Sequence, residues 1–448
     1  MMQSLIDKSS DPVSLSELDL FSIPPTQVAV VDQRYREIHP TNPIQDAGPF
    51  NFRVLMDKNN LQLSKNYLYV KFKITDLSGA DIPVDLANSV KNDRISPIQA
   101  LGATFISQIK CYINNVLVED TGNLYPYRSM LELDWNHDKL TKISNLKPSL
   151  YAYTEGNLGT STDNGYEERF QATKGSKEFE TFAPLHLSLF QQERLMPNMI
   201  DLNLHISRCS DAFLLKRFEN TNPALTGFKL KIKDIKLYIK EYTLNDSVSL
   251  GLEKTLMSGH LARYPLKVVK MANFHIPGGS VSSPQSTIFS QVLPKRILVG
   301  LVNTKALFGD HTKDPFKFEN FDLKNISLEV GGKIIPHNRL ELDYTNGHYM
   351  HAYYQTLDAL GYLGRNKTCS ISPKMFKDGG FNIYAFDVST ACDDRTFDFV
   401  TPGVTRISLT FNTYLPVDGC SAIVLGEFDQ LLNIDSTRTP FTDTSSVK

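Results

Sequence analysis

The residues of this sequence that could do chemistry are its histidine and carboxylate pairs, and His348 and His351 form its closest histidine pair. On a helix, a spacing of three residues can place two imidazoles on one face, as a metal site requires. Asp358 could share that face, but it lies about two turns beyond His351 and is too far away to bind the same ion. A zinc site needs a third and a fourth ligand. We therefore expect a structural or surface role for this pair rather than a metal site.

The other candidate side chains favour ordinary structural roles. His186 and His205 lie in strand-like stretches, where we expect surface histidines. Asp393 and Asp394, in the segment Cys392–Arg395, resemble a paired carboxylate only superficially. Adjacent carboxylates beside an arginine are typical of a solvated turn, so we expect no catalysis there.

One basic stretch raises the question of nucleic acid. Its lysines alternate with apolar residues: Lys229, Lys231, Lys233, Lys236 and Lys240. The simplest interpretation is one solvated face of a strand, because we see no arginine or aromatic residue interleaved for base contact. The many aromatic residues, 26 Phe and 19 Tyr, are expected to fill the core between sheets rather than to form a stacking surface.

Motifs of known enzymes are missing. The sequence has no phosphate-binding loop, no G-x-G-x-x-G, no H-E-x-x-H and no G-x-S-x-G. It also lacks the H-x-H that a metal-dependent jelly-roll enzyme of the cupin type needs. We therefore assign no catalytic, cofactor-binding or metal-binding residue and expect a protein that is not an enzyme and needs no cofactor.

The composition is that of an ordinary globular chain. Its 448 residues suggest two or three domains, and 47 Lys plus Arg against 49 Asp plus Glu give a net charge of −2. A protein that coats nucleic acid needs a concentrated cationic face, so this balance argues against direct nucleic-acid binding.

Cysteine usage indicates a reducing compartment. The five cysteines are odd in number and contain no C-x-x-C pair: Cys111, Cys209, Cys369, Cys392 and Cys420. We expect Cys111 and Cys209 to act as small core hydrophobes. The polar first eleven residues predict no signal peptide, and the longest apolar run, at 297–302, is too short for a transmembrane helix.

Alternation of apolar and polar residues predicts strands in the first half. It is clearest at 67–74 and recurs at 109–113 and 202–206. Asn114 and Asn115 predict a tight hairpin into 116–118. The alternation over 229–240 changes phase near residues 233 and 234, which is the signature of a β-bulge.

A few helices and further strands complete the pattern. We expect a helix at 247–258, with Asp246 as N-cap and Gly259 as stop, and two more at 127–135 and 349–363. Strands are predicted in the second half at 268–276, 296–302, 326–330, 381–386, 406–413 and 422–428.

The chain therefore reads as an all-β protein with two β-rich halves. One-sided strands need a second layer, so we expect two tandem eight-stranded jelly-roll sandwiches, a double jelly roll, with a few short helices and long polar loops at 78–97, 134–179 and 343–380. The predicted divisions are an N-terminal arm at 1–47, jelly roll 1 at 48–245, a helical connector at 246–262, jelly roll 2 at 263–435 and a C-terminal tail at 436–448.

Seven segments in order carry a family resemblance over residues 48 to 435. They are Leu63–Lys71 (LSKNYLYVK), Cys111–Val118 (CYINNVLV), Asn123–Arg128 (NLYPYR), Phe190–Asn198 (FQQERLMPN), Leu293–Val302 (LPKRILVGLV), Asp314–Asp322 (DPFKFENFD) and Glu427–Asp435 (EFDQLLNID). Together they resemble the double jelly-roll major capsid proteins of Polinton/Maverick elements and the related adintoviruses.

The resemblance implies a structural function. Such proteins form pseudo-hexagonal, hexon-like homotrimers that tile an icosahedral shell around a double-stranded DNA genome, and they are not enzymes. The implied partners are the chain itself and the penton and minor capsid proteins, with no sequence-specific nucleic-acid binding. The implied location is the virion, assembled inside the host cell; membrane contact stays open. We expect residues 1 to about 45 to lie under the shell or to reach a neighbouring chain.

Two alternatives stay open. A penton or minor capsid protein generally needs one jelly roll and forms pentamers, which the two-half layout disfavours. A jelly-roll carbohydrate-binding module or enzyme would need convergent polar residues in a pocket, and the sequence shows none. The sequence is silent on the host, the triangulation number, the outward-facing loops and whether the source is an active virus or an integrated element.

Overall fold

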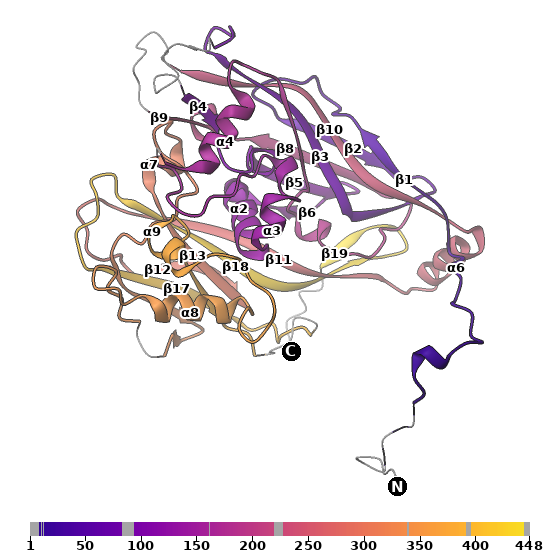
Figure 1. Ribbon diagram of the computed structural model, residues 1–448. Helices are drawn as coiled ribbons and strands as arrows, with labels where there is room; N and C mark the ends of the chain where they lie inside the picture. The colour runs from indigo at the N-terminus through magenta and orange to yellow at the C-terminus, as the bar shows by residue number, and fades with distance from the viewer. Residues whose placement is uncertain are drawn as a thin grey trace.

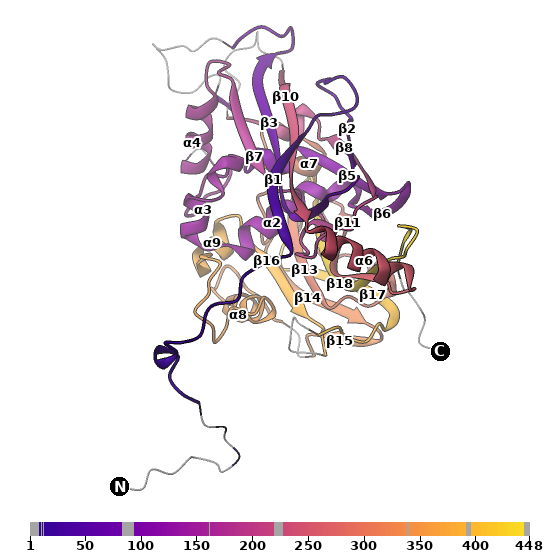
Figure 2. The same cartoon turned by 90° about the vertical axis from the view of Figure 1, so that its right-hand side faces the viewer.

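The computed structural model describes residues 9, 11, 13–82, 94–160, 162–218, 227–337, 340–390 and 396–442. Two β-sandwiches lie side by side, the first at the upper right of Figure 1 and the second at the lower left. Figure 2 shows that α3, α4, α8 and α9 gather along one side of the molecule. No helix within the described ranges is long and apolar enough to cross a membrane.

The first sandwich consists of two four-stranded sheets, and the second consists of one five-stranded and one four-stranded sheet. In the first sandwich one sheet has the order β1 (Val30–Ile38), β10 (Phe228–Leu244), β3 (Asn60–Asp76), β7 (Phe179–Ala183), and the other has β2 (Phe50–Leu55), β8 (Asp201–Arg208), β5 (Ile106–Ile113), β6 (Val116–Asp120). In the second sandwich the orders are β11 (Ala262–Ile276), β18 (Cys420–Ile434), β13 (Arg296–Asn303), β16 (Ile383–Asp387) and β12 (Ser286–Val292), β17 (Pro402–Phe411), β14 (Leu323–Val330), β15 (Lys333–Ile335). A short strand, β19 (Pro440–Thr442), pairs antiparallel with the end of β18. Strand β4 (Arg94–Pro97) pairs with β9 (Leu215–Phe218).

Both sandwiches follow one strand order. When the eight strands of each are counted along the chain, one sheet reads 1-8-3-6 and the other reads 2-7-4-5 in both halves. This order is that of a jelly roll, in which antiparallel strands far apart in the sequence become neighbours. The predicted fold class, two tandem eight-stranded jelly-roll sandwiches, is confirmed.

The helices lie in the connections between strands. They are η1 (Ser16–Leu18), α1 (Leu101–Thr104), η2 (Gly122–Leu124), α2 (Tyr125–Asn136), α3 (Lys139–Ile143), η3 (Lys147–Ser149), α4 (Asn164–Thr173), η4 (Ser188–Phe190), α5 (Asp211–Leu214), α6 (Asp246–Met257), α7 (Thr304–Phe308), α8 (Met350–Ala359) and α9 (Pro373–Asp378). The two predicted loops at 134–179 and 343–380 correspond to the same jelly-roll connection, between the fifth and sixth strands of each sandwich. In the remaining predicted loop, at 78–97, residues 83–93 lie outside the described residues.

The predicted strand patterns correspond to the observed ones. Along β3, Leu68, Val70 and Phe72 are fully buried while the residues between them are only half-buried. Strand β10 shifts register between Ile232 and Asp234, which confirms the predicted bulge and keeps the apolar side chains on the inner face.

The predicted hairpin between β5 and β6 is also confirmed. Asn114 and Asn115 both have left-handed backbone angles, with φ of 46° and 65°. A two-residue hairpin turn of this hand needs positive φ at both positions, and asparagine tolerates it better than other side chains do.

The connector helix begins one residue earlier than predicted. The N-cap of α6 is Asn245 and not Asp246, because Asn245 Oδ1 accepts the Ser247 backbone N–H at 3.1 Å. Gly259 follows the end of the helix, as predicted, and its φ of +92° is the left-handed conformation that favours glycine there. The other two predicted helices are present as α2 and α8, with shifted ends.

The predicted N-terminal arm is too long. Residues 30–38, inside its 1–47 range, form β1, which pairs with β10 at the edge of the first sandwich. The sequence hides this strand because only Ile38 is buried, so the apolar alternation is missing. The predicted tail likewise contains β19. Residues 1–8 and 443–448 lie outside the described residues.

The segment before β1 runs away from the body in both views (Figures 1 and 2). Its large apolar side chains are exposed, and the most exposed, Phe21, reaches 94%. The others are Val13, Leu15, Leu18, Leu20, Ile23 and Val28. An extended segment with this many exposed apolar side chains has the character of a binding segment for another surface.

Candidate functional site

His348 and His351 lie on different elements. Helix α8 begins at Met350, so His348 precedes it in a turn, where its backbone N–H bonds to Asp343 O at 2.7 Å. Only His351 is helical, so the two imidazoles do not share a helix face, and the structural or surface role expected for the pair stays a prediction. The described residues contain no group of three His, Cys, Asp or Glu side chains that could hold a metal ion.

The two strand histidines differ in their surroundings. His205 lies on the surface, as predicted, with Nδ1 at 2.8 Å from Asn51 Oδ1. The surface role predicted for His186 is wrong, because His186 is buried and its Nδ1 lies 2.6 Å from Glu132 Oε2. Its hydrogen-bond partners, Tyr125 and Glu132, lie on α2, more than fifty positions away, which local sequence cannot reveal.

The remaining candidates are the acidic segment and two cysteines. The acidic segment Cys392–Arg395 lies outside the described residues. Cys111 is fully buried, as expected of a core residue, and Cys209 is partly buried. Burial raises the pKa of Cys209 to about 12, so neither sulfur has the character of a reactive thiolate.

The lysines of β10 lie on the outer face of the sheet β1-β10-β3-β7, and they do not stand alone. Tyr238 lies between Lys236 and Lys240 on the same face, so the expectation of no interleaved aromatic residue is wrong. Lys236 pairs with Glu37 of β1 at 2.8 Å. On the adjacent strand β3, Lys71 pairs with Glu178 and Lys73 pairs with Asp81. This face therefore mixes both signs of charge.

Five aromatic residues form a continuous strip across this outer face, which we name the aromatic strip. Its members are Tyr35, Tyr67, Tyr69, Phe182 and Tyr238. Tyr67 is central: its ring centroid lies 4.8 Å from that of Tyr238, 5.4 Å from that of Tyr35 and 5.7 Å from that of Phe182. Tyr35 remains 47% exposed and Phe182 37%. For these five residues the prediction of core filling is wrong.

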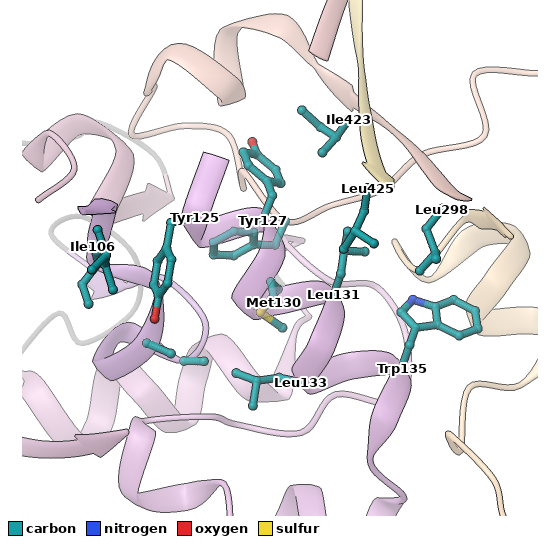
Figure 3. Packing of buried hydrophobic residues seen from close by; sticks show 14 of the residues in the cluster. Ile106, Tyr125, Tyr127, Met130, Leu131, Leu133, Trp135, Leu298, Ile423 and Leu425 are labelled. Carbon is teal, nitrogen blue, oxygen red and sulfur yellow. The ribbon is translucent and has the colours of Figure 1, made fainter. Parts of the chain in front are cut away.

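The equivalent sheet of the second sandwich is covered within the chain. Figure 3 shows Leu131 and Trp135 of α2 packed against Leu298 of β13 and Leu425 of β18, and all four side chains are buried. Ile423 of β18 adds to the same contact. One hydrophobic cluster therefore runs through both sandwiches, and α2 is its bridge.

A buried polar network lies at the edge of this contact. Arg128 of α2 donates to Glu119 at 2.9 Å, to Glu132 at 3.1 Å and to Ser188 at 3.2 Å. Ser188 Oγ in turn accepts the Val269 N–H of β11 at 3.4 Å. Burial alone would raise the pKa of Glu132, but Arg128 and His186 lower it to about 2. The network ties the first sandwich to the edge strand of the second.

The two long loops, at 134–179 and 343–380, also contact each other through polar groups. Lys142 Nζ donates to Asp134 O at 2.6 Å and to Cys369 O at 2.8 Å, and the Tyr362 hydroxyl donates to Trp135 O. Burial raises the pKa of the Asp134 carboxyl to about 6. Its Oδ1 accepts the hydroxyl of Tyr151 at 2.7 Å. These polar contacts join α2 and α3 to the connection that holds α8 and α9.

Two of the hollows on the described surface differ in their linings. A groove of about 310 Å³ beside α6 is mostly apolar, with Leu244, Leu252 and Leu256 in its wall. A cleft of about 510 Å³ lies between η2, β11 and α7 and is lined mainly by neutral residues such as Asn123 and Phe308. The wall of the first groove also carries Asn60, Glu253 and His260.

Comparison with known proteins places the fold. No family model matches the chain. A chain from the Sputnik virophage structure covers 100% of this chain and 96% of its own, with 12% identity and a TM-score of 0.63. The mavirus major capsid protein covers 99% of this chain and 96% of its own, with 11% identity and a TM-score of 0.56. The fold is a double jelly roll. At these identities the likeness establishes the double jelly roll alone.

A sequence relative has the same extent. The uncharacterized protein F54H12.2 of Caenorhabditis elegans is 28% identical over 426 residues, which is 94% of this chain and 99% of the relative. The double jelly-roll chain therefore has a nearly full-length counterpart in a nematode.

Sequence reasoning missed the aromatic strip and the interface between the sandwiches. A signal for the strip was present, because Tyr67 and Tyr69 occupy the outward positions of a strand whose alternate residues are apolar. The interface gave no comparable signal, since it joins residues up to about 290 positions apart, such as Leu131 and Leu425.

Proposed function

We propose that this protein is a major capsid protein that assembles as a homotrimer, and that such trimers tile a shell around a double-stranded DNA genome. The observation that carries the proposal is the pair of jelly rolls with one strand order, held side by side by α2. Three such chains supply six similar sandwiches, the number that a pseudo-hexagonal unit needs. The likeness to the mavirus major capsid protein supports the same function.

The role is structural and non-enzymatic. The likeness to a viral major capsid protein, whose role is structural, supports this proposal. The proposed location is the virion, with penton and minor capsid proteins as further partners. The proposed origin is a Polinton/Maverick or adintovirus-like element, on the resemblance of the seven segments quoted above.

The segment before β1 is proposed to act in assembly. Its exposed apolar residues have no covering surface within the described chain, and it extends away from both sandwiches. A neighbouring capsomer or the inner side of the shell would bury them, and burial of apolar area stabilises association.

Two measurements test the proposal. Light scattering after gel filtration should give three times the chain mass of 50.5 kDa at micromolar concentration. Negative-stain images should show pseudo-hexagonal particles or shells. A monomer would refute the trimer, and a five-fold mass would favour a penton protein instead. Binding of glycans at submillimolar affinity would favour a carbohydrate-binding module.

A further inference from the structure

The shared strand order makes the two halves of the chain comparable element by element. Sheet β1-β10-β3-β7 of the first sandwich corresponds to sheet β11-β18-β13-β16 of the second. Helix α2 lies between the fifth and sixth strands of the first sandwich, and α8 lies between the fifth and sixth strands of the second. Each contact made by one half therefore has a definable counterpart in the other half.

Within the chain, one of these contacts is complete. The outer face of β13 and β18 is covered by α2, so β13 is buried on both faces from Ile297 to Val302. On β18 the residues from 420 to 426 are likewise all buried. The eight-stranded sandwich alone would bury only alternate residues, and the additional burial is the mark of the covering helix.

The equivalent contact for the sheet of the first sandwich would join two surfaces, and both are uncovered within the described chain. The first sandwich offers the aromatic strip, on the strands β3 and β10 that correspond to β13 and β18. No described residue covers Tyr35 or Phe182 fully, and along β10 burial still alternates. The face has the chemistry of an interface, because aromatic residues are enriched where protein surfaces meet.

The other half is the outward face of α8. Its inner residues Ala352, Thr356 and Ala359 are buried, and Thr356 Oγ1 donates to Ile383 O of β16 at 3.0 Å. Its outward residues include Met350 at 53% exposure and Tyr354 at 60%. These two lie four positions apart, so they project from one face of the helix.

The two open surfaces lie at opposite ends of the molecule. Figure 1 shows the sheet with β3 and β10 at the upper right and α8 at the lower left. One chain cannot bring them together, but a second copy in head-to-tail arrangement can. Head-to-tail contacts generate closed rings when the rotation allows closure.

We infer that α8 of one copy covers the aromatic strip of the next copy, as α2 covers β13 and β18 within the chain. This inference rests on the proposed homotrimer and names the surface that builds it. In a trimer, the α2 contact within each chain would alternate with the α8 contact between chains. Six sandwiches would then form a ring in which each has similar neighbours. Tyr354 and Met350 are the anchors on one side, and Tyr67 is the centre of the other.

Charge substitutions test the two surfaces separately. Tyr354→Glu and Phe182→Glu each bring a carboxylate into the proposed contact, and we expect each to raise the dissociation constant of the trimer by at least about 30-fold. Val417→Glu, in the turn between β17 and β18 and 98% exposed, belongs to neither surface, is the matched control and should leave the trimer intact. Tyr354→Phe keeps the ring and should also assemble. Light scattering across a dilution series measures all four.

Cross-linking gives a test that does not depend on the folding of the charged variants. Tyr354→Cys is combined in turn with Tyr35→Cys and with Phe182→Cys, in a Cys392→Ser background. Because the two ends of one chain are far apart, a disulfide under mild oxidation can join only different chains. We expect covalent dimers and trimers on a non-reducing gel for at least one pair, and none for the single cysteines.

The outcomes separate this inference from the proposed function. A wild-type trimer that tolerates both glutamate substitutions and gives no cross-link would overturn the inference and leave the capsid trimer standing. A wild-type protein that is monomeric at micromolar concentration would overturn the proposed function itself. Loss of the trimer in both glutamate variants, together with a specific cross-link, supports the inference.

Discussion

Replacement of Leu131 by alanine should loosen the contact between the two sandwiches. Leu131 is buried on α2 and meets Leu425 of β18 (Figure 3). A buried leucine truncated to alanine costs about 2–5 kcal/mol, and the cost is larger where the neighbours cannot collapse into the cavity. Here the cavity lies between a helix and a hydrogen-bonded sheet, both held by their own contacts. We therefore expect a loss of about 3 kcal/mol in the free energy of unfolding.

The chain carries its own probe for this experiment. Trp135, the single tryptophan of the sequence, lies one turn after Leu131 and packs against Leu298 of the second sandwich. Its fluorescence therefore reports on the interface, while circular dichroism reports on all strands. Urea denaturation should be followed by both signals at one fixed protein concentration, because association adds to the apparent stability.

Leu140→Ala provides the control. Leu140 lies on α3 close in sequence and is 70% exposed, so its loss should change the free energy of unfolding by no more than about 0.5 kcal/mol. If Leu131→Ala is no more destabilising than Leu140→Ala, the contact through α2 does not hold the sandwiches together. Separate transitions by fluorescence and circular dichroism would show that the two halves unfold independently.

Three further predictions follow from the same structure. A chain that begins at residue 30 should still form trimers but fail to form shells, whereas a chain that begins at residue 46 also loses β1 and should be unstable in thermal melts; shells from the first truncation would contradict the role of the arm. Folding lowers the pKa of Glu132 from 4.5 to about 2, so its ionised form stabilises the fold above pH 4.5 and this stabilisation is lost as the pH falls towards 2. The stability difference between wild type and Glu132→Gln should accordingly shrink by about 3 kcal/mol between pH 7 and pH 2 in urea titrations, and a constant difference would show that Glu132 gains nothing from Arg128. Finally, fluorescence anisotropy should detect no tight binding of duplex DNA at 0.15 M salt, since the β10 lysines share their face with carboxylates.

Local patterns predicted much of each sandwich. The inward residues of β3, the Asn114–Asn115 turn and the bulge in β10 all follow from the sequence, because each depends on residues within a few positions of one another. Strand β1 escaped prediction for a physical reason: an edge strand with one buried residue carries no alternation to read. Helix α4 was not predicted because its buried side chains include Arg169, and arginine usually marks the solvent-exposed face of a helix.

The candidate surfaces could be predicted only in part. Outward tyrosines on β3 are visible in the sequence, but their meeting with Phe182 and Tyr238 depends on the pairing of β3 with β7 and β10. The burial of His186 depends on α2 and on Glu132, more than fifty positions away. Sequence periodicity identifies the face on which a side chain lies, but not what lies opposite that face.

The pairing of β1 with β10 also fixes where the arm originates. The Asn245 N–H donates to Ala29 O at 2.9 Å, so the arm leaves the body next to α6, at the junction of the two sandwiches. Residues 13–29 span at most about 60 Å when fully extended. The arm is thus a tether of defined origin and limited reach, and Phe21, eight residues before Ala29, can contact only a surface within about 30 Å of that origin.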